Sequence, residues 1–127
     1  MKLLLDTHTF IWWDSDPAQL SPPALAAVRD PANEAWLSVA SVWEMVIKAE
    51  LGKLTLRLPL ADIVQQQQAN GLRILPVTLP HALAVEGLPA IHKDPFDRVL
   101  IAQANVEGAE LVSGDQTVRQ YPVRILW

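Results

Sequence analysis

The stretch Lys2-Leu3-Leu4-Leu5-Asp6 decides how this chain is expected to fold. Its three consecutive leucines form a short apolar run of the kind found in a buried strand. Asp6 ends the run where the strand is expected to turn into a helix. Three more acidic residues hold comparable places at predicted turns from strand to helix: Glu44, Asp97 and Asp115. In a parallel sheet such turns lie along one edge, so four carboxylates are expected to meet in one cleft.

Predicted strands and helices alternate along the chain. The expected strands are short apolar runs and cover residues 2–5, 35–38, 73–77, 111–113 and 123–126. The expected helices are bounded by Pro, Gly and capping residues and cover residues 10–13, 22–29, 39–51, 60–69, 80–86 and 95–106. This alternation predicts an α/β fold, a three-layer sandwich in which helices flank a central parallel five-stranded sheet. Strand 2–5 is the natural centre, which puts Asp6 where ligands bind in such sheets.

The composition indicates a single domain whose surface includes apolar residues that a partner is expected to cover. A chain of 127 residues suits one domain spanning residues 1–127, and the absence of cysteine fits a reducing cytoplasm. No run approaches the roughly 18–20 apolar residues of a membrane span. Hydrophobic residues make up 50% of the chain and charged residues 19%, which favours a second copy or another protein as partner. The net charge of −4 argues against a DNA-binding module.

Several large apolar residues are expected to pack in the core or at an interface. In helix 39–51, Val39, Trp43, Val46 and Ile47 have the spacing of a core-facing stripe. The tryptophans at positions 12, 13, 36 and 43 are expected in the core or at an interface, with stacking on nucleic-acid bases as the alternative.

Two of the four acids also have a purely structural interpretation at a helix start. Asp6 can cap a helix that begins near Thr9. The stretch from Ser41 to Glu44 matches a capping box, with Ser41 as N-cap and Glu44 reaching back, and Glu44 also precedes Lys48 by four residues.

The remaining acids can likewise be interpreted either as caps of a helix or turn or as metal ligands. Asp94, which precedes Pro95, is a strong N-cap candidate. Asp97 falls in the first turn of the same helix, where the cap already serves the backbone, so it has less structural reason to be acidic. Asp115 can begin a short turn over residues 116–119. Each acid taken alone therefore leaves capping and metal binding open.

Repulsion between the four carboxylates favours the metal interpretation if they converge. Two carboxylates about 6 Å apart repel by roughly 2–3 kcal/mol at an effective dielectric near 20, and four form several such pairs. The dipole at a helix N-terminus stabilises each carboxylate by only about 0.3–1 kcal/mol. Mg²⁺ or Mn²⁺ offsets the repulsion, prefers carboxylate oxygens and leaves positions open for a phosphate. The sequence thus predicts a divalent-metal site and, with it, phosphodiester hydrolysis.

A few neighbouring residues are candidates for supporting roles. His92 is placed to assist substrate binding or to anchor its loop, and Ser113 to orient Asp115 or a metal-bound water or simply to end a strand. Basic residues near the predicted cleft are candidates for contacts with the phosphate backbone: Lys48, Lys53, Lys93 and Arg98. No HExxH, GxSxG, Walker or GxGxxG motif is present, so zinc-protease, acyl-transfer and nucleotide-binding chemistry have no support.

In this order, the acidic segments resemble the PIN-domain family, and within it VapC-like toxins of toxin–antitoxin pairs. The resemblance runs the whole length of the chain and rests on four segments: Asp6-Thr7-His8; Ser41 with Glu44; His92 to Ala104, with Asp94-Pro95-Phe96-Asp97-Arg98; and Ser113-Gly114-Asp115. The stretch 94–104 is its most specific part.

The resemblance implies a Mg²⁺- or Mn²⁺-dependent endoribonuclease. It implies a parallel sheet of strand order 3-2-1-4-5, a homodimer, and a small antitoxin protein whose tail covers the acidic cleft. The family's four acids correspond to Asp6, Glu44, Asp97 and Asp115. Ser113 stands where the family often has Thr, and Asp94 is an extra acid shared with one branch.

Three other interpretations of the acids are open. A phosphoacceptor signalling domain needs an acidic pair after the first strand and a lysine after the last, whereas Thr7 follows Asp6 and no lysine occurs after Lys93. A PIN-like domain that only binds a partner is less compatible with four retained acids. These residues do not distinguish a DNA-directed from an RNA-directed nuclease, or one metal from two.

Overall fold

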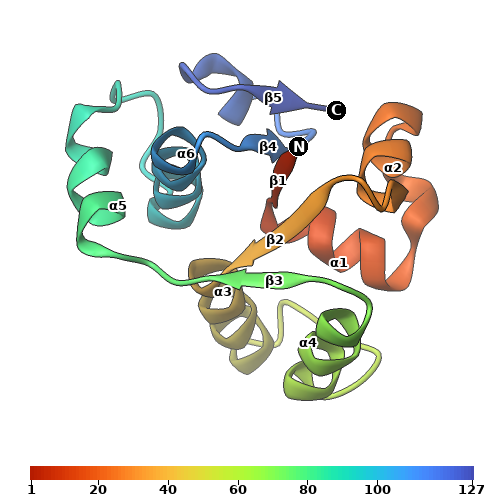
Figure 1. Ribbon diagram of the computed structural model, residues 1–127. Helices are drawn as coiled ribbons and strands as arrows, with labels where there is room; N and C mark the ends of the chain where they lie inside the picture. The colour runs from red at the N-terminus through yellow and green to blue at the C-terminus, as the bar shows by residue number, and fades with distance from the viewer.

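Five parallel strands form one sheet, with β1 (Lys2–Leu5) at its centre (Figure 1). The computed structural model describes residues 1–127. The strand order is β3-β2-β1-β4-β5, as the resemblance implied, and the other strands are β2 (Glu34–Ser38), β3 (Arg73–Leu75), β4 (Glu110–Val112) and β5 (Ile125–Leu126). The register places Leu4 opposite Trp36 on one side and Leu111 on the other. The predicted α/β fold with a central β1 is confirmed.

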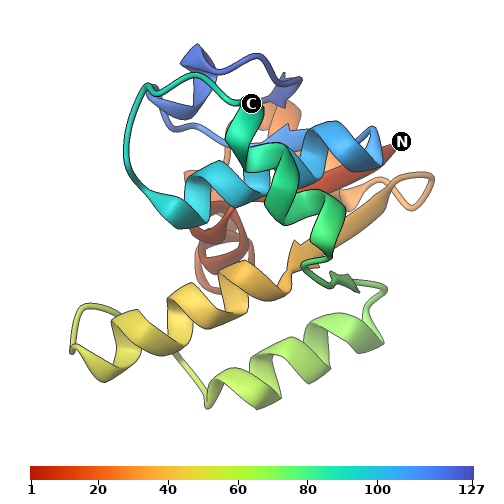
Figure 2. The same cartoon turned by 90° about the vertical axis from the view of Figure 1, so that its left-hand side faces the viewer.

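Six α-helices connect and cover these strands. They are α1 (Thr7–Ser15), α2 (Pro22–Arg29), α3 (Val39–Glu50), α4 (Leu60–Ala69), α5 (Leu79–Ala84) and α6 (Pro95–Glu107). Three short segments form 3-10 turns: Pro17–Gln19, Val85–Gly87 and Val118–Gln120. In Figure 1, α5 and α6 lie on one side of the sheet and α1 and α2 on the other. Figure 2 views the face that α5 and α6 cover. No helix combines the length and the apolar character needed to cross a membrane.

Alternation along β1 builds the two cores of this sandwich. Leu3 and Leu5 pack with Phe10 and Met45 on the side of α1 and α3, whereas Leu4 packs with Leu100 on the side of α6. All three leucines of β1 are fully buried, which is why the run is continuously apolar. The central strand is thereby fixed by apolar contacts on both of its faces.

The structure lengthens or shortens several predicted elements. Helix α1 begins at Thr7 rather than residue 10, because Asp6 caps it. Strand β3 ends at Leu75 rather than residue 77, because Pro76 has no N–H to donate to a neighbouring strand. Helix α6 ends where expected, at Gly108, whose φ of 65° is the left-handed conformation that favours glycine at a helix C-terminus.

The predicted core-facing stripe of α3 is wrong. Val39, Trp43 and Val46 are exposed, with 62% of Trp43 accessible, whereas Ala40, Ser41, Glu44 and Met45 are buried. The inner face of α3 carries the buried polar side chains of Ser41 and Glu44, and the apolar stripe of the helix is displaced toward solvent by about one residue. Trp43 is therefore a surface residue. Trp12, Trp13 and Trp36 pack partly buried against the cores, as predicted.

Candidate active site

Asp6 caps α1 and also faces a cavity at the carboxyl end of β1. Its Oδ1 accepts a hydrogen bond from the Thr9 N–H at 2.7 Å, so the predicted capping role is confirmed. Burial raises the pKa of Asp6, and hydrogen bonds from Ser113 and Thr9 oppose that rise. Asp6 and Asp115 line the same cavity, so capping occupies one oxygen of Asp6 without removing the carboxylate from the cleft.

Glu44 lies in the interior of α3, where it is buried yet fully partnered. Its Oε1 lies 2.7 Å from the Thr7 hydroxyl and its Oε2 lies 2.7 Å from Lys48 Nζ. The predicted capping box is wrong, because Ser38 caps α3 by accepting from the Ala40 N–H. Glu44 therefore does not reach back to the helix start, and its burial has no capping explanation.

Asp94 and Asp97 share the start of α6 but have different surroundings. Asp94 Oδ1 accepts hydrogen bonds from the Phe96 and Asp97 N–H groups, as expected of the N-cap. Asp97 Oδ2 lies 3.1 Å from Nε2 of His92. Burial, followed by the charges of Asp94 and two other nearby carboxylates, raises the pKa of Asp97 to about 6, although His92 opposes the rise.

Asp115 follows β4 and begins the short turn that the sequence indicated. Its Oδ1 accepts from the N–H groups of Thr117 and Val118 at 2.8 and 3.2 Å. Ser113 is fully buried, and its hydroxyl accepts a hydrogen bond from the Asp115 N–H at 3.2 Å. Ser113 thus connects Asp115 with Asp6, whose pKa its hydroxyl lowers.

The four acids lie along one edge of the sheet and act on one another electrostatically. Asp97 is influenced by Glu44 and Asp115, and the pKa of Lys48 is raised by its hydrogen bond to Glu44 and by the charge of Asp97. No three acidic or histidine side chains, however, are close enough to enclose one metal ion. The arrangement is looser than the predicted tight cluster, and two of the carboxylates have partners of opposite charge: Glu44 contacts Lys48 and Asp97 contacts His92.

The donor atoms at this edge fit a hard divalent cation. All four candidate ligands offer carboxylate oxygens, which Mg²⁺ and Mn²⁺ prefer. Lys48 pairs with Glu44 and His92 with Asp97, and burial together with the charges of Asp94, Asp115 and Glu44 raises the pKa of Asp97. A cation is the species that would relieve the repulsion among these carboxylates.

His92 links the site to the loop beneath it. Besides contacting Asp97, its Nδ1 lies 2.7 Å from the Tyr121 hydroxyl, and its backbone N–H donates to the same oxygen. These hydrogen bonds outweigh burial and raise the pKa of His92. The loop-anchoring role considered for His92 is therefore present, and the same ring also reaches a candidate catalytic acid.

Arg98 does not point a free charge at the cleft. Its guanidinium donates to the backbone carbonyl groups of Pro89 and Val85 and to the Tyr121 hydroxyl, and it lies over the Tyr121 ring. These contacts tie α6 to the preceding loop. Three of its five N–H donors are used in these contacts, which favours a structural role for Arg98 over the predicted contact with a phosphate backbone.

Two residues without a role in the sequence analysis, Thr7 and Tyr121, support the groups of this site. Thr7 Oγ1 contacts both Glu44 and Ser41; since a carboxylate only accepts, Thr7 donates to Glu44 and Ser41 donates to Thr7. Tyr121 orients His92 and Arg98. Thr7 follows directly after an acidic turn, a weak signal, whereas nothing in the sequence marked Tyr121.

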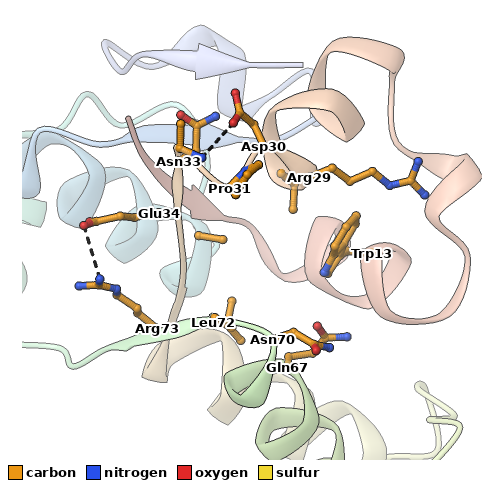
Figure 3. Close-up of a pocket in the computed structure, with 14 residues that line it drawn as sticks. Trp13, Arg29, Asp30, Pro31, Asn33, Glu34, Gln67, Asn70, Leu72 and Arg73 are labelled. Atoms are coloured by element: carbon orange, nitrogen blue, oxygen red, sulfur yellow. Dashed lines mark hydrogen bonds and ion pairs between the residues drawn. The ribbon is translucent and has the colours of Figure 1, made fainter.

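The largest cavity lies at the opposite edge of the sheet, where β2 and β3 begin (Figure 3). It measures about 630 Å³ and holds no cluster of acids. Its arginines are engaged: Arg73 pairs with Glu34 at 3.7 Å, and Arg29 lies over the ring of Trp13. The candidate active site is therefore the acidic edge and not this larger hollow.

Comparison with known proteins assigns the family. The model of the PIN domain matches residues 3–123. The chain belongs to the PIN-domain family. Ribonuclease VapC22 of Mycobacterium tuberculosis is 32% identical to this PIN domain over 120 residues, which cover 94% of this chain and 91% of the relative. The resemblance stated from the acidic segments is confirmed.

Solved structures share the PIN fold over nearly the whole chain. VapBC2 from Rickettsia felis, bound to a DNA fragment from its promoter, has a TM-score of 0.71 at 14% identity and covers 98% of this chain and 97% of the other. DNA-bound VapBC from Salmonella typhimurium has a TM-score of 0.68 at 17% identity and covers 98% and 96%. At such low identities the likeness establishes the fold alone.

Proposed function

We propose that this protein is a divalent-metal-dependent endoribonuclease that acts as the toxin of a toxin–antitoxin pair in the cytoplasm. The activity is supported by family membership and by the relative named Ribonuclease VapC22. The site is supported by one observation above all: Asp97, at the start of α6, is influenced by carboxylates that come from α3, from the residue before α6 and from the turn after β4. Chain segments far apart in sequence thus bring negative charge to one edge.

We assign Asp6, Glu44, Asp97 and Asp115 as the residues that hold the metal, directly or through water. A bound Mg²⁺ or Mn²⁺ supplies a water of lowered pKa and neutralises charge on the scissile phosphate. Thr7 and Ser113 orient Glu44, Asp6 and Asp115, and His92 fixes the rotamer of Asp97. Lys48 neutralises Glu44 and is the nearest cation for a phosphate.

A small antitoxin protein is the proposed partner. The solved neighbours are described as VapBC assemblies, and another, from Klebsiella pneumoniae, as a toxin–antitoxin complex. The acidic edge favours a basic segment of that partner, because unpaired carboxylates attract Lys or Arg. A short open reading frame next to this one, whose product co-purifies with the protein and suppresses cleavage, would support this part of the proposal.

We further propose that a second copy covers the apolar surface formed by α3, α5 and the start of α6. A cavity of about 470 Å³ there is lined almost entirely by apolar groups, including Val39, Trp43, Val77 and Phe96. Leu79 and Leu83 on α5 are 71% and 61% exposed. Exposed apolar side chains in such number are typical of an interface. Sedimentation of the wild type and of Leu83→Glu distinguishes dimer from monomer.

Cleavage of purified RNA tests the central proposal. The protein is incubated with total RNA, or with DNA of matched length, with and without Mg²⁺, and the cut ends are mapped. Metal-dependent cuts in RNA, absent with Asp97→Asn and retained with the remote Asp62→Asn, support the proposal. Cuts confined to DNA would change the substrate class. Absence of metal-stimulated cleavage on either substrate would favour a PIN domain that only binds a partner.

A further inference from the structure

The cavity that Asp6 faces extends beyond the acidic edge, and its remaining lining residues have no role in the proposed function. It measures about 260 Å³ and lies between the start of α1, the turn Pro17–Gln19 and the chain that follows β4 and β5. Asp6 and Asp115 form one part of its wall, and the remaining lining residues are His8, Trp12, Gln19, Gly114 and Trp127. Whatever occupies this cavity therefore lies directly beside two of the proposed metal ligands.

Aromatic rings form the other part of the wall. The rings of Trp12 and Trp127 lie 6.2 Å apart at an angle of 49°, and those of His8 and Trp12 lie 5.7 Å apart at 38°. Trp12 and Trp127 are only partly buried and His8 is exposed, so the rings are accessible from solvent. Trp12 and Trp127 pack against the core with part of each indole and leave the rest accessible beside the acidic site.

Gly114 places the Trp127 indole against the backbone of the site. A Cβ atom at position 114 would lie 2.6 Å from Cε2 of Trp127, closer than real contacts allow. Glycine thus lets the indole approach the chain between Ser113 and Asp115. The aromatic wall and the acidic edge are held together at this one point of contact.

The chemistry of the lining disfavours an anionic group and offers aromatic surface to a flat ligand. No lysine or arginine lines the cavity, so it offers no charge to a phosphate. Its volume falls below the roughly 300–1,000 Å³ of pockets for drug-sized ligands, which suits a single ring system. Gln19 uses its Nε2 to bind Asp16 Oδ2 at 3.1 Å, and its Oε1 is left as an acceptor for a polar ring edge. Unpaired nucleobases have these properties and stack on aromatic side chains.

We propose that this cavity is a base-binding subsite: one unpaired base of the RNA stacks on Trp127 and Trp12, and Gln19 contacts its edge. The subsite positions the neighbouring phosphate at Asp6 and Asp115 and gives the enzyme a base preference next to the cut. This inference rests on the proposed ribonuclease function. It makes Trp127 and Gln19 positioning residues that determine where the RNA is cut.

Binding of single-stranded RNA to a cleavage-deficient protein provides the first test. In the Asp97→Asn background with Mg²⁺, the affinity for a set of fluorescent pentanucleotides is measured by anisotropy. Adding Trp127→Ala is expected to weaken binding by about 5-fold to about 100-fold, the range that loss of one base–aromatic stack produces. Trp127→Phe should restore most of the affinity. Trp13→Ala, on the same helix as Trp12 but facing the remote cavity of Figure 3, should change it less than about two-fold.

Cut-site mapping with otherwise wild-type protein provides the second test. Trp127→Ala and Gly114→Ala, which displaces the indole, should both relax the base preference next to the cut, whereas Trp13→Ala should leave it unchanged. Thermal melting of each variant confirms that it is folded. Wild-type cleavage with unchanged affinity and unchanged cut sites in the Trp127 and Gly114 variants overturns the subsite while leaving the ribonuclease proposal intact.

Two further outcomes also overturn the subsite. One is a parent protein that binds none of the pentanucleotides. The other is a Trp127→Ala variant that loses affinity for the tail of a co-purifying protein partner but not for RNA, since the cavity would then belong to a peptide. Failure of the wild type to cut any RNA is a separate result and counts against the proposed function itself.

Discussion

Nε2 of His92 lies 3.1 Å from Oδ2 of Asp97, and both groups have a pKa above its usual value. The two pKa values are raised for different reasons. Burial and neighbouring carboxylates favour protonated Asp97, while Asp97 itself favours protonated His92. With a pKa of about 6, Asp97 ionises within the pH range in which the metal-free protein can be studied.

The pKa of Asp97 predicts how its replacement alters stability with pH. The folded protein holds the Asp97 proton up to about pH 6, whereas the unfolded carboxyl loses it near 3.8. Ionised Asp97 thus destabilises the metal-free fold, and this cost develops as pH rises from about 4 to about 6. Asp97→Asn should leave the melting temperature unchanged at pH 4 and raise it by about 3–5 °C at pH 7, equivalent to about 1 kcal/mol after allowance for solvent screening.

Calorimetry in EDTA at both pH values measures this difference. Asp62→Asn, which replaces an exposed acid in the first turn of α4, serves as the control and should show a similarly small effect at pH 4 and pH 7. A uniform effect of Asp97→Asn at all pH values would contradict the raised pKa.

Metal binding should convert the repulsion at this edge into stabilisation. Mn²⁺ or Mg²⁺ should raise the melting temperature of the wild type in a concentration-dependent way, because a ligand of the folded state stabilises it by mass action. Asp6→Asn and Asp97→Asn should each remove most of that increment and reduce kcat/KM at least about a hundred-fold, since loss of a residue that merely hydrogen-bonds to a metal ligand costs about 10- to 100-fold in affinity or activity. Equal increments in wild type and variants would refute the assigned ligands.

Lys48 should oppose the metal while supporting the metal-free fold. Its Nζ lies 2.7 Å from Glu44, so Lys48→Gln should lower the melting temperature in EDTA by a few degrees at most, because the lysine is half-exposed. The same change should enlarge the stabilisation by Mn²⁺, because one competing positive charge is gone. Lys53→Gln, on the exposed loop after α3, is the matched control. A reduced metal response in Lys48→Gln would contradict this competition.

Arg98 should prove to be a structural residue. Arg98→Ala removes charged hydrogen bonds to two backbone carbonyl groups and to Tyr121, and should reduce stability by about 1–3 kcal/mol. The salt dependence of RNA binding should stay as in the wild type, because Arg98 contacts no phosphate. Arg124→Ala, an exposed arginine, should cost little stability. Wild-type stability combined with a weaker salt dependence in Arg98→Ala would restore the phosphate-contact interpretation.

The capped acids show where sequence and structure complement each other. Asp6, Asp94 and Asp115 each accept from the backbone N–H groups of the following turn, as their positions before a helix or turn predicted. The local pattern determines such bonds, since both partners lie within three residues. The same pattern failed at Ser41 and Glu44, where a serine three residues earlier begins the helix. Two candidate caps in succession look alike in sequence, and packing of α3 on α1 selects between them.

Local pattern was enough to predict the parallel sheet, the central β1 and four acids at its carboxyl edge, because three buried leucines and alternating strands and helices are compatible with few other topologies. Folding sets the spacing of those acids, the outward orientation of Trp43, the hydrogen bonds of Arg98 and the approach of Trp127 to Gly114 beside Asp115. These facts depend on contacts between segments distant in the chain, whose geometry is set by packing and not by local pattern.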